Sequence, residues 1–467
     1  MSISELPFYA NALDIPALWE EFPPPPIYFK GVARMDHSGL AALQARRFMQ
    51  QVERAWQVPF YQRHWGRAGL KPGDIRGIED ISIIPPFSVA DLRESIELMP
   101  PFGDYMGYDP KSDPPMPLVM QTSGGTTGIP RPMLYSPRDR EVVNIMGARR
   151  LYAHGVRPHD LVQVTHSLGL SNAGLSTRES LWKYTGAVPV MTGAGSATPT
   201  RRQIELMKAW KVKVLIGFPA YLRHMALVAR DEMGIDPRTM NVRFLSTHLG
   251  TEDRGVLEDL WGAKVYDTYG ANEAGMIAAD CEEQNGMHVY EDAHFVEVVD
   301  LESGQAVPEG ENGTVFVTCL FKHLAPMIRF NINDISAFVP GDCPCGCTHR
   351  RLAGIFGRSD NMVKLRGVNV YPDAIGSVIG DVIETTGEYV CVVDLVDGRD
   401  EMTVLVESVR EEAPNNQSGQ AALELRFKEA LNVKVTAKIV ARGALDQMTG
   451  LSKTSKIKRL IDNRKKG

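Results

Sequence analysis

Apolar residues recur with helical spacing near the start of the chain. Ser38 can cap a helix, and the apolar residues that follow it share one face: Leu40, Leu43, Phe48, Val52 and Trp56. The four prolines at 23–26 favour an extended segment before this helix. The pattern predicts a helical and loop-rich first hundred residues.

From about residue 160, short apolar runs alternate with stretches of helical spacing. The apolar runs predict strands at Leu161–Val164, Val212–Gly217, Val242–Leu245 and Lys264–Thr268. The stretches between them predict helices, two of which are Arg202–Trp210 and Ala220–Met233. Alternating strands and helices form a parallel, doubly wound sheet. Because ligands of such sheets bind beyond the carboxyl ends of the strands, we expect the functional loops there.

The character of the chain changes after Gly357. Residues 389–407 predict a hairpin that turns at Asp397-Gly398, and a further strand is predicted at Val433–Val440 before a basic tail. The predicted fold class is α/β. We expect a large N-terminal domain, residues 1–358, of layered, mostly parallel sheets and helices. A small, mobile α+β C-terminal domain, residues 359–467, follows a hinge near Asp360.

Composition narrows the class of partner. The 467 residues are 43% hydrophobic and carry a net charge of −6, which argues against nucleic acid or an anionic membrane surface as the main partner. No apolar run approaches the roughly 20 residues that cross a bilayer. The first residues lack the basic start and apolar segment of a secretory signal, so we expect a cytoplasmic protein.

The strongest local signal is the run from Gln121 to Arg131, QTSGGTTGIPR. Its glycines and hydroxyl residues offer backbone N–H groups and rotatable donors to phosphate oxygens, and the candidate ATP-binding residues are Ser123, Gly124, Gly125, Thr126, Thr127 and Gly128. It is not a Walker loop, because no Gly-Lys-Ser/Thr ends it. Taken alone, the run is also compatible with a flexible surface loop.

The run resembles the phosphate-binding stretch of the adenylate-forming superfamily, and within it the phenylacetate-CoA ligase group. Five more stretches match that family in order, at residues 247–252, 266–273, 326–334, 357–372 and 453–459. The resemblance covers the chain from about residue 120 to the end. It implies an ATP-dependent acid-CoA ligase that forms an acyl-adenylate and then a thioester, with ATP, Mg²⁺ and coenzyme A as cofactors and substrates.

The resemblance also implies a role for each matched position. Glu273 and Lys456 would be catalytic, Asp360 would be the hinge, Arg366 and Gly367 would lie in the loop that faces coenzyme A, and the remaining nucleotide contacts would be Gly250, Thr251, Glu252, Asp267, Thr268, Tyr269, Gly270, Asn272, Asp334 and Arg358. In the family, the small domain rotates after adenylation, which removes the lysine and brings the Lys364–Tyr371 loop to the site.

The chemistry of these roles can be argued independently. Attack of a carboxylate on the α-phosphate brings an anion to a polyanion, so the site must neutralise charge. Glu273 can hold Mg²⁺, and Lys456 can act as a mobile charge between the phosphate and the acyl carboxylate. The alternatives are a solvated acid for Glu273, a core tyrosine for Tyr269 and a solvated basic tail for Lys456.

Cysteines form a second signal. Cys281, His288, Cys343 and Cys345 make a set of three thiolates and one imidazole that is typical of structural zinc, and related ligases carry a similar arrangement. Cys347 is a rival ligand. The alternative is free buried thiols.

The acid substrate is predicted from the segment at 164–174. Its candidate pocket residues are His166, Ser167, Gly169, Leu170 and Ser171, and no aromatic residue follows until Trp182. Hydroxyl groups and few aromatic walls favour a small acid with a polar substituent, such as the short branched 2-hydroxy acid 2-hydroxyisobutyrate, and the chain looks similar to ligases of that acid. The alternatives are an arylacetate, or an acid loaded onto a carrier protein.

Two other classes of protein carry weight. The chain could be a nucleotide-binding regulatory protein without chemistry, although Glu273, Asp334 and Lys456 together argue against it. A zinc-centred interaction module would not need the phosphate loop. A homodimer is expected from general frequency alone.

Overall fold

The structure is a computed structural model that describes most of the chain. The described residues are 8–108, 115–122, 130–359, 363–366, 368–379, 383–396, 399–410, 416–449 and 458–466. Within them, no helix is both long and apolar enough to cross a bilayer.

The first hundred residues are helical, as predicted. The helix expected after Ser38 is α3, but it begins at His37 and its cap is Asp36, whose Oδ1 accepts a hydrogen bond from the Gly39 N–H at 2.7 Å. Ser38 donates its hydroxyl to the same carboxylate and so supports the cap from inside the first turn. The helices of this part are α1 (Ile15–Glu21), α2 (Ile27–Lys30), α3 (His37–Ala55), α4 (Pro59–Arg67) and α5 (Val89–Leu98).

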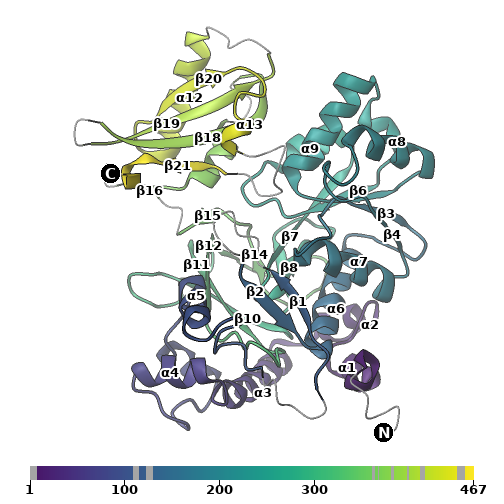
Figure 1. The fold of residues 1–467 in the computed structure, drawn as a ribbon, viewed down its shortest axis with the longest axis vertical. Helices are drawn as coiled ribbons and strands as arrows, with labels where there is room; N and C mark the ends of the chain where they lie inside the picture. Colours follow the sequence, from purple (N-terminus) through teal and green to yellow (C-terminus); the bar gives the residue numbers. More distant parts are fainter. Residues whose placement is uncertain are drawn as a thin grey trace.

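A nine-stranded sheet forms the centre of the molecule (Figure 1). Its strand order is β13-β14-β9-β8-β7-β6-β5-β3-β4. The strands are β3 (Leu161–Val164), β4 (Val188–Met191), β5 (Val214–Ile216), β6 (Phe244–Thr247), β7 (Lys264–Ala271), β8 (Gly275–Ala279), β9 (Met287–Val289), β13 (Phe338–Val339) and β14 (Arg351–Leu352).

Helices cover both faces of this sheet because its central strands are apolar on both sides. In β5, Leu215 packs in one cluster with α8, α9 and α10, whereas Val214 and Ile216 pack in another with α6 and α7. The helices are α6 (Pro137–Ala153), α7 (Asn172–Tyr184), α8 (Thr200–Trp210), α9 (Pro219–Leu227) and α10 (Arg254–Trp261), with a short π-helix at Val228–Glu232 after α9.

The expectation of mostly parallel sheets holds for only half of this sheet. The pairs from β4 to β7 are parallel, but β7, β8, β9, β14 and β13 pair antiparallel. The connections from β7 to β8 and from β8 to β9 are too short for a crossover helix, so the chain turns directly back on itself there. The α/β class is confirmed, and the large sheet is mixed.

Two smaller antiparallel sheets complete the N-terminal part. A hairpin pairs β1 (Val119–Thr122) with β2 (Pro132–Tyr135). A four-stranded sheet has the order β10-β11-β12-β15, made of β10 (His294–Val299), β11 (Gly313–Cys319), β12 (Phe330–Ser336) and β15 (Gly357–Arg358).

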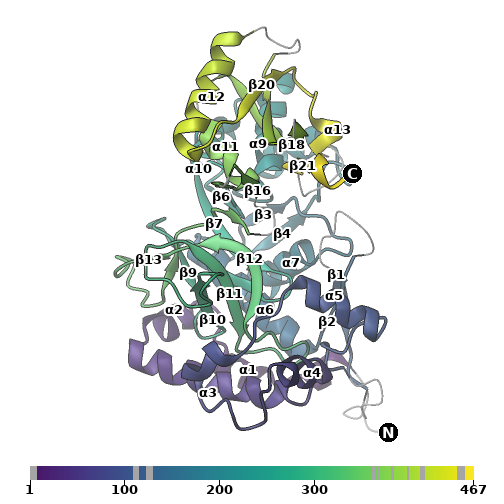
Figure 2. The same cartoon turned by 90° about the vertical axis from the view of Figure 1, so that its left-hand side faces the viewer.

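The C-terminal part has a core of its own. Buried apolar residues between Val363 and Ile439 form one cluster that includes no residue from before position 363. The hairpin predicted at 389–407 is β18–β19, and the last predicted strand begins three residues later than expected, at Thr436. The elements are β16 (Val363–Leu365), β17 (Val368–Val370), α11 (Ile375–Ile379), β18 (Thr385–Val396), β19 (Arg399–Ser408), α12 (Gln417–Leu431), β20 (Thr436–Val440), α13 (Asp446–Thr449) and β21 (Leu460–Asp462). Both views show this part beside α9 (Figures 1 and 2).

Candidate active site

The predicted phosphate loop connects two paired strands. Thr122 at the end of β1 pairs with Pro132 at the start of β2, so residues 123–131 form the connection. The predicted phosphate contacts Ser123, Gly124, Gly125, Thr126, Thr127 and Gly128 lie outside the described residues, as do Asp360, Gly367 and Lys456. Their roles stay predictions.

Thr122 joins three stretches that are far apart in the sequence. Its N–H donates to the Leu170 carbonyl at 2.8 Å, and its own carbonyl accepts from Nδ2 of Asn272 at 3.3 Å. Tyr135 of β2 donates its hydroxyl to the Asn272 carbonyl at 2.7 Å. The start of the phosphate loop, the predicted acid segment and the predicted adenine motif therefore meet at one place.

The turn after β6 is held by Asp267. Its Oδ1 accepts the N–H groups of Leu249 and Thr268, both at 2.8 Å, and burial raises the pKa of this carboxyl group to about 6. Gly250 has φ +58°, a conformation that suits glycine. Thr268 donates its hydroxyl to the Thr247 carbonyl at 3.0 Å, so the end of β7 and the turn predicted to lie beneath the adenine form one unit.

The predicted ribose contacts are also brought together. Asp334 of β12 pairs with Arg358 of β15, and Nη1 of Arg358 lies 2.8 Å from Oδ1 of Asp334. Tyr269 donates its hydroxyl to Oδ2 at 2.9 Å. Burial, followed by the Asp334 charge, raises the pKa of Tyr269, which therefore stays protonated and orients the carboxylate.

Close packing surrounds Tyr269. Only 1% of its surface is exposed, and the His248 ring lies stacked at 6.2 Å. Gly270, the next residue, has no room for a side chain, because a Cβ there would lie 2.5 Å from the Gly275 carbonyl oxygen. Tyr269 is thus packed like a core tyrosine and also has a polar link to Asp334. Its stacking on adenine stays a prediction.

Glu273 lies in a buried, charged environment. Its carboxylate forms an ion pair with Arg131, and the two side chains are 8% and 5% exposed. Lys322 donates its Nζ to the Glu273 backbone carbonyl at 2.9 Å. Arg131 ends the predicted phosphate-loop motif, and no role was predicted for it. Because it follows that loop directly, Arg131 joins the loop to the acid predicted to hold Mg²⁺.

Two predicted nucleotide residues reach toward the C-terminal part. Thr251 donates its hydroxyl to the Asp373 carbonyl, and Glu252 forms ion pairs with Arg223 and Arg459, both at 3.0 Å. Arg366 of the predicted coenzyme A loop is paired with Glu401.

The predicted acid segment follows β3 at the carboxyl edge of the sheet. His166 is buried and neutral, because burial lowers its pKa to about 3, whereas Ser167, Gly169, Leu170 and Ser171 are exposed. The Phe218 ring packs edge-on against His166 with 4.7 Å between ring centres. Phe218 follows the adjacent strand β5, so an aromatic residue that is distant in sequence reaches the segment. No pattern within residues 164–182 indicates this contact.

The predicted zinc ligands converge. One ligand atom from each of Cys281, His288, Cys343 and Cys345 lies within 4.8 Å of all the others. The Cys281 and Cys343 sulfurs are 3.7 Å apart, and the Cys345 sulfur is 3.3 Å from Nε2 of His288. Tetrahedral zinc with bonds of about 2.3 and 2.0 Å requires separations of roughly 3.8 and 3.5 Å.

Contacts around this set also fit a metal. His288 has Nδ1 at 3.0 Å from the His349 carbonyl, which places the proton there and turns the Nε2 lone pair toward the thiols. Cys347 lies outside the converging set, and its backbone N–H approaches the Cys345 sulfur at 3.4 Å.

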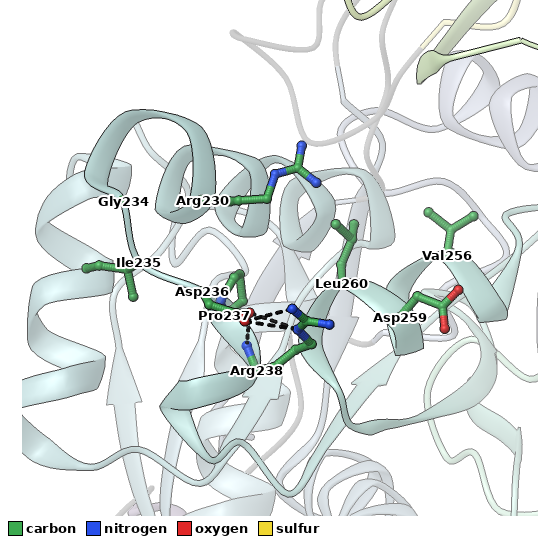
Figure 3. Close-up of a pocket in the computed structure, with 9 residues that line it drawn as sticks. All are labelled: Arg230, Gly234, Ile235, Asp236, Pro237, Arg238, Val256, Asp259 and Leu260. Atoms are coloured by element: carbon green, nitrogen blue, oxygen red, sulfur yellow. Dashed lines mark hydrogen bonds and ion pairs between the residues drawn. The ribbon is translucent and has the colours of Figure 1, made fainter.

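A separate surface cavity of about 620 Å³ lies between the π-helix and α10 (Figure 3). Its charged side chains are largely paired locally, since Arg238 binds Asp236 and Arg230 binds Asp231. None of the predicted site residues lines it. The lining residues are Arg230, Gly234, Ile235, Asp236, Pro237, Arg238, Val256, Asp259 and Leu260.

Comparison with known proteins agrees with this geometry. The family of AMP-binding enzyme C-terminal domains matches residues 367–464. A phenylacetate-coenzyme A ligase of Thermus thermophilus is 32% identical over 378 residues, which cover 79% of this chain and 81% of the relative. The chain belongs to the adenylate-forming superfamily, in its phenylacetate-CoA ligase-like group. It is an ATP-dependent, AMP-forming acid-CoA ligase.

Other members of the group span nearly the whole chain. A phenylacetate-coenzyme A ligase of Aromatoleum evansii is 28% identical over 455 residues, which cover 95% of this chain and 99% of the relative. The structure of a 2-hydroxyisobutyryl-CoA ligase in the postadenylation state, with its 2-hydroxyisobutyryl adenylate, matches with TM-score 0.83 at 28% identity and covers 92% of this chain and 91% of that one.

The same ligase in its thioesterification state, with coenzyme A, matches with TM-score 0.67 at 29% identity over the same shares of both chains. The overall arrangement of this chain is therefore more similar to the postadenylation structure than to the thioesterification structure.

Proposed function

We propose that this ligase activates a small aromatic acid of the arylacetate class, with phenylacetate as the parent compound. The observation that carries the proposal is the Phe218 ring against the neutral His166 at the carboxyl ends of β3 and β5. An aromatic ring and an uncharged imidazole favour a planar apolar group over a charged one. The names of the curated relatives support this alternative better than the 2-hydroxy acid that sequence analysis placed first.

A short 2-hydroxy acid is the second candidate. The match to the 2-hydroxyisobutyryl-CoA ligase structure supports it, as do the exposed hydroxyl residues Ser167 and Ser171 in the same segment as His166. A site that binds a substrate hydroxyl rejects acids that lack one.

A panel of acids separates these candidates. We expect phenylacetate to give a kcat/KM at least about tenfold above that of 2-hydroxyisobutyrate, measured as coenzyme A-dependent AMP release. Phe218→Ala should lower the value for phenylacetate by about tenfold and change that for smaller acids less. The control is Phe8→Ala, which removes an exposed phenylalanine. A preference for 2-hydroxyisobutyrate in the wild type would reverse our order.

The proposed adenylation site would use residues from β7, β12, β15, the turn after β6 and the C-terminal tail. Asp334, oriented by Tyr269 and Arg358, would bind the ribose hydroxyls, and the turn at Gly250–Glu252 would lie beneath the adenine. Glu273 would hold Mg²⁺, which supplies charge neutralisation at the phosphates when bound. Lys456 would stabilise the charge that develops as the carboxylate attacks the α-phosphate and pyrophosphate leaves. Transfer to a carrier protein instead of coenzyme A would be revealed by competition between the two thiols.

We also propose that Cys281, His288, Cys343 and Cys345 bind one structural zinc ion. Four protein ligands complete a tetrahedral shell and leave no position for a substrate. The ion would join the loop after β8 to the loop after β13, and so brace the antiparallel half of the large sheet.

Metal analysis tests this assignment. We expect about one zinc per chain in the native protein, and a lower metal content and thermal midpoint after Cys345→Ser. Cys347→Ser serves as the matched control and should keep the metal, because Cys347 lies outside the converging set. Loss of zinc in the control, or its absence from native protein, would contradict the ligand set.

A further inference from the structure

Four charged residues form a closed ring between the two parts of the ligase. In Arg223 of α9, Nη1 lies 3.0 Å from Oε2 of Glu252 and Nη2 lies 2.5 Å from Oε1 of Glu388. In Arg459, Nη2 lies 3.0 Å from Oε1 of Glu252 and Nη1 lies 2.9 Å from Oε2 of Glu388. Each guanidinium group therefore contacts both carboxylates. Arg223 and Glu252 belong to the N-terminal part, and Glu388 and Arg459 to the C-terminal part.

The ring is buried and electrically balanced. The side chains of Arg223, Glu388 and Arg459 are 10%, 4% and 8% exposed, and that of Glu252 is 23% exposed. Burial disfavours the charged form of Glu252, but the two guanidinium groups outweigh it and lower its pKa. Two positive and two negative charges cancel, so removing one member leaves an uncompensated charge at the interface.

The backbone near Glu388 is shaped for this approach. The β18–β19 register shifts between Thr385 and Tyr389, which marks a bulge that contains Glu388. Gly387 in this bulge has φ +81°, and a Cβ there would lie 2.3 Å from Nη1 of Arg223. A bulge can redirect a side chain, and the glycine allows the guanidinium group of the other domain to come close.

The ring connects the predicted adenine turn to the segment that carries Lys456. Glu252 ends that turn, and Arg459 follows Lys456 by three residues. Arg459 donates to the Tyr389 carbonyl at 2.9 Å and lies 4.3 Å above the Tyr389 ring. Tyr389 donates its hydroxyl to the Asp373 carbonyl at 2.8 Å, and the Thr251 hydroxyl donates to the same atom. Both ends of the connection are thus fixed by hydrogen bonds.

We propose that the ring of Arg223, Glu252, Glu388 and Arg459 positions the C-terminal domain for acyl-adenylate formation and must open before thioester formation. This inference rests on the ligase activity and does not depend on which acid is the substrate. Domain rotation separates Arg223 from Glu388 and Glu252 from Arg459, so the ring favours one of two domain arrangements. Arg223, Glu388 and Arg459 act as positioning residues through the segment of Lys456.

The two half-reactions test the proposal separately. Acid-dependent exchange of pyrophosphate into ATP reports adenylation, and coenzyme A-dependent consumption of supplied acyl-adenylate reports thioester formation. We expect Glu388→Gln to slow the first at least about tenfold and to leave the second unchanged or faster. A residue that only stabilises the fold would lower both.

A double variant supplies the critical comparison. Arg223→Gln alone should resemble Glu388→Gln, whereas the double variant should lose less adenylation activity than the two single losses predict, because it is again neutral and keeps the Glu252–Arg459 pair at 3.0 Å. Arg442→Gln is the matched control. It removes an exposed pair across the same interface, 3.9 Å from Asp231, and should keep both rates.

Small-angle X-ray scattering with ATP gives a readout that needs no acid. The wild type should scatter as a closed arrangement, and Glu388→Gln should shift toward a more extended one, with a thermal midpoint that shows a folded protein. Equal losses in both half-reactions, strict additivity of the two substitutions, or unchanged scattering and unchanged rates would overturn the proposal. If the wild type adenylates no acid in the panel while its scattering still responds to Glu388→Gln, the substrate assignment is wrong. The role of the ring in domain arrangement is then still supported.

Discussion

Replacing Lys456 with alanine is expected to slow acyl-adenylate formation by about 10²–10³-fold and to leave thioester formation from supplied acyl-adenylate largely intact. The physical reason is that a single mobile charge stabilises the transition state of one half-reaction only. Pyrophosphate exchange and coenzyme A-dependent adenylate consumption, measured on the same preparation, separate the two steps.

Lys458→Ala is the matched control for this prediction. Lys458 lies two residues later in the same basic segment, is exposed, and donates its backbone N–H to the Thr449 carbonyl, so removal of its side chain should change neither rate. If both variants reduce adenylation alike, the effect belongs to the net charge of the tail. Equal loss of both half-reactions in Lys456→Ala would contradict the role of that residue.

Replacing Glu273 with glutamine is expected to reduce adenylation by about 10²-fold, and higher Mg²⁺ concentration should restore only part of the rate. The substitution also leaves Arg131 unpaired at 5% exposure, which is expected to cost roughly 3–5 kcal/mol of folding stability. Rate and thermal midpoint are therefore both measured.

A second substitution separates these two effects. Glu273→Gln with Arg131→Gln removes both charges and should recover thermal stability. If Glu273 holds Mg²⁺, the double variant stays slow, because the carboxylate ligand is still missing. If Glu273 serves only to neutralise Arg131, the double variant recovers activity together with stability, and the assignment of the metal ligand is wrong.

The antiparallel half of the large sheet was not predictable from the sequence. The parallel strands around Val214–Ile216 were predictable because apolar runs separated by helices permit few other topologies. The return strands β8, β9 and β14 are short, and two of them contribute only two or three residues, so they carry no clear periodicity. Each takes its place by pairing with a neighbouring strand, β8 with β7, β9 with β8 and β14 with β9, and a local pattern does not record these contacts.

The amino-acid sequence by itself determined the family, the α/β class and the order of the chemical motifs, because each motif is a run of neighbouring residues whose chemistry is local. It also identified the four zinc-ligand candidates that converge within 4.8 Å. Tertiary structure alone decided that Arg131 pairs with Glu273, that Phe218 reaches His166, and that Arg223, Glu252, Glu388 and Arg459 close one ring. These contacts join residues that lie 29 to 207 positions apart. They arise where strand ends and domain surfaces meet, and the energy of a buried charge or ring depends on neighbours that only folding supplies.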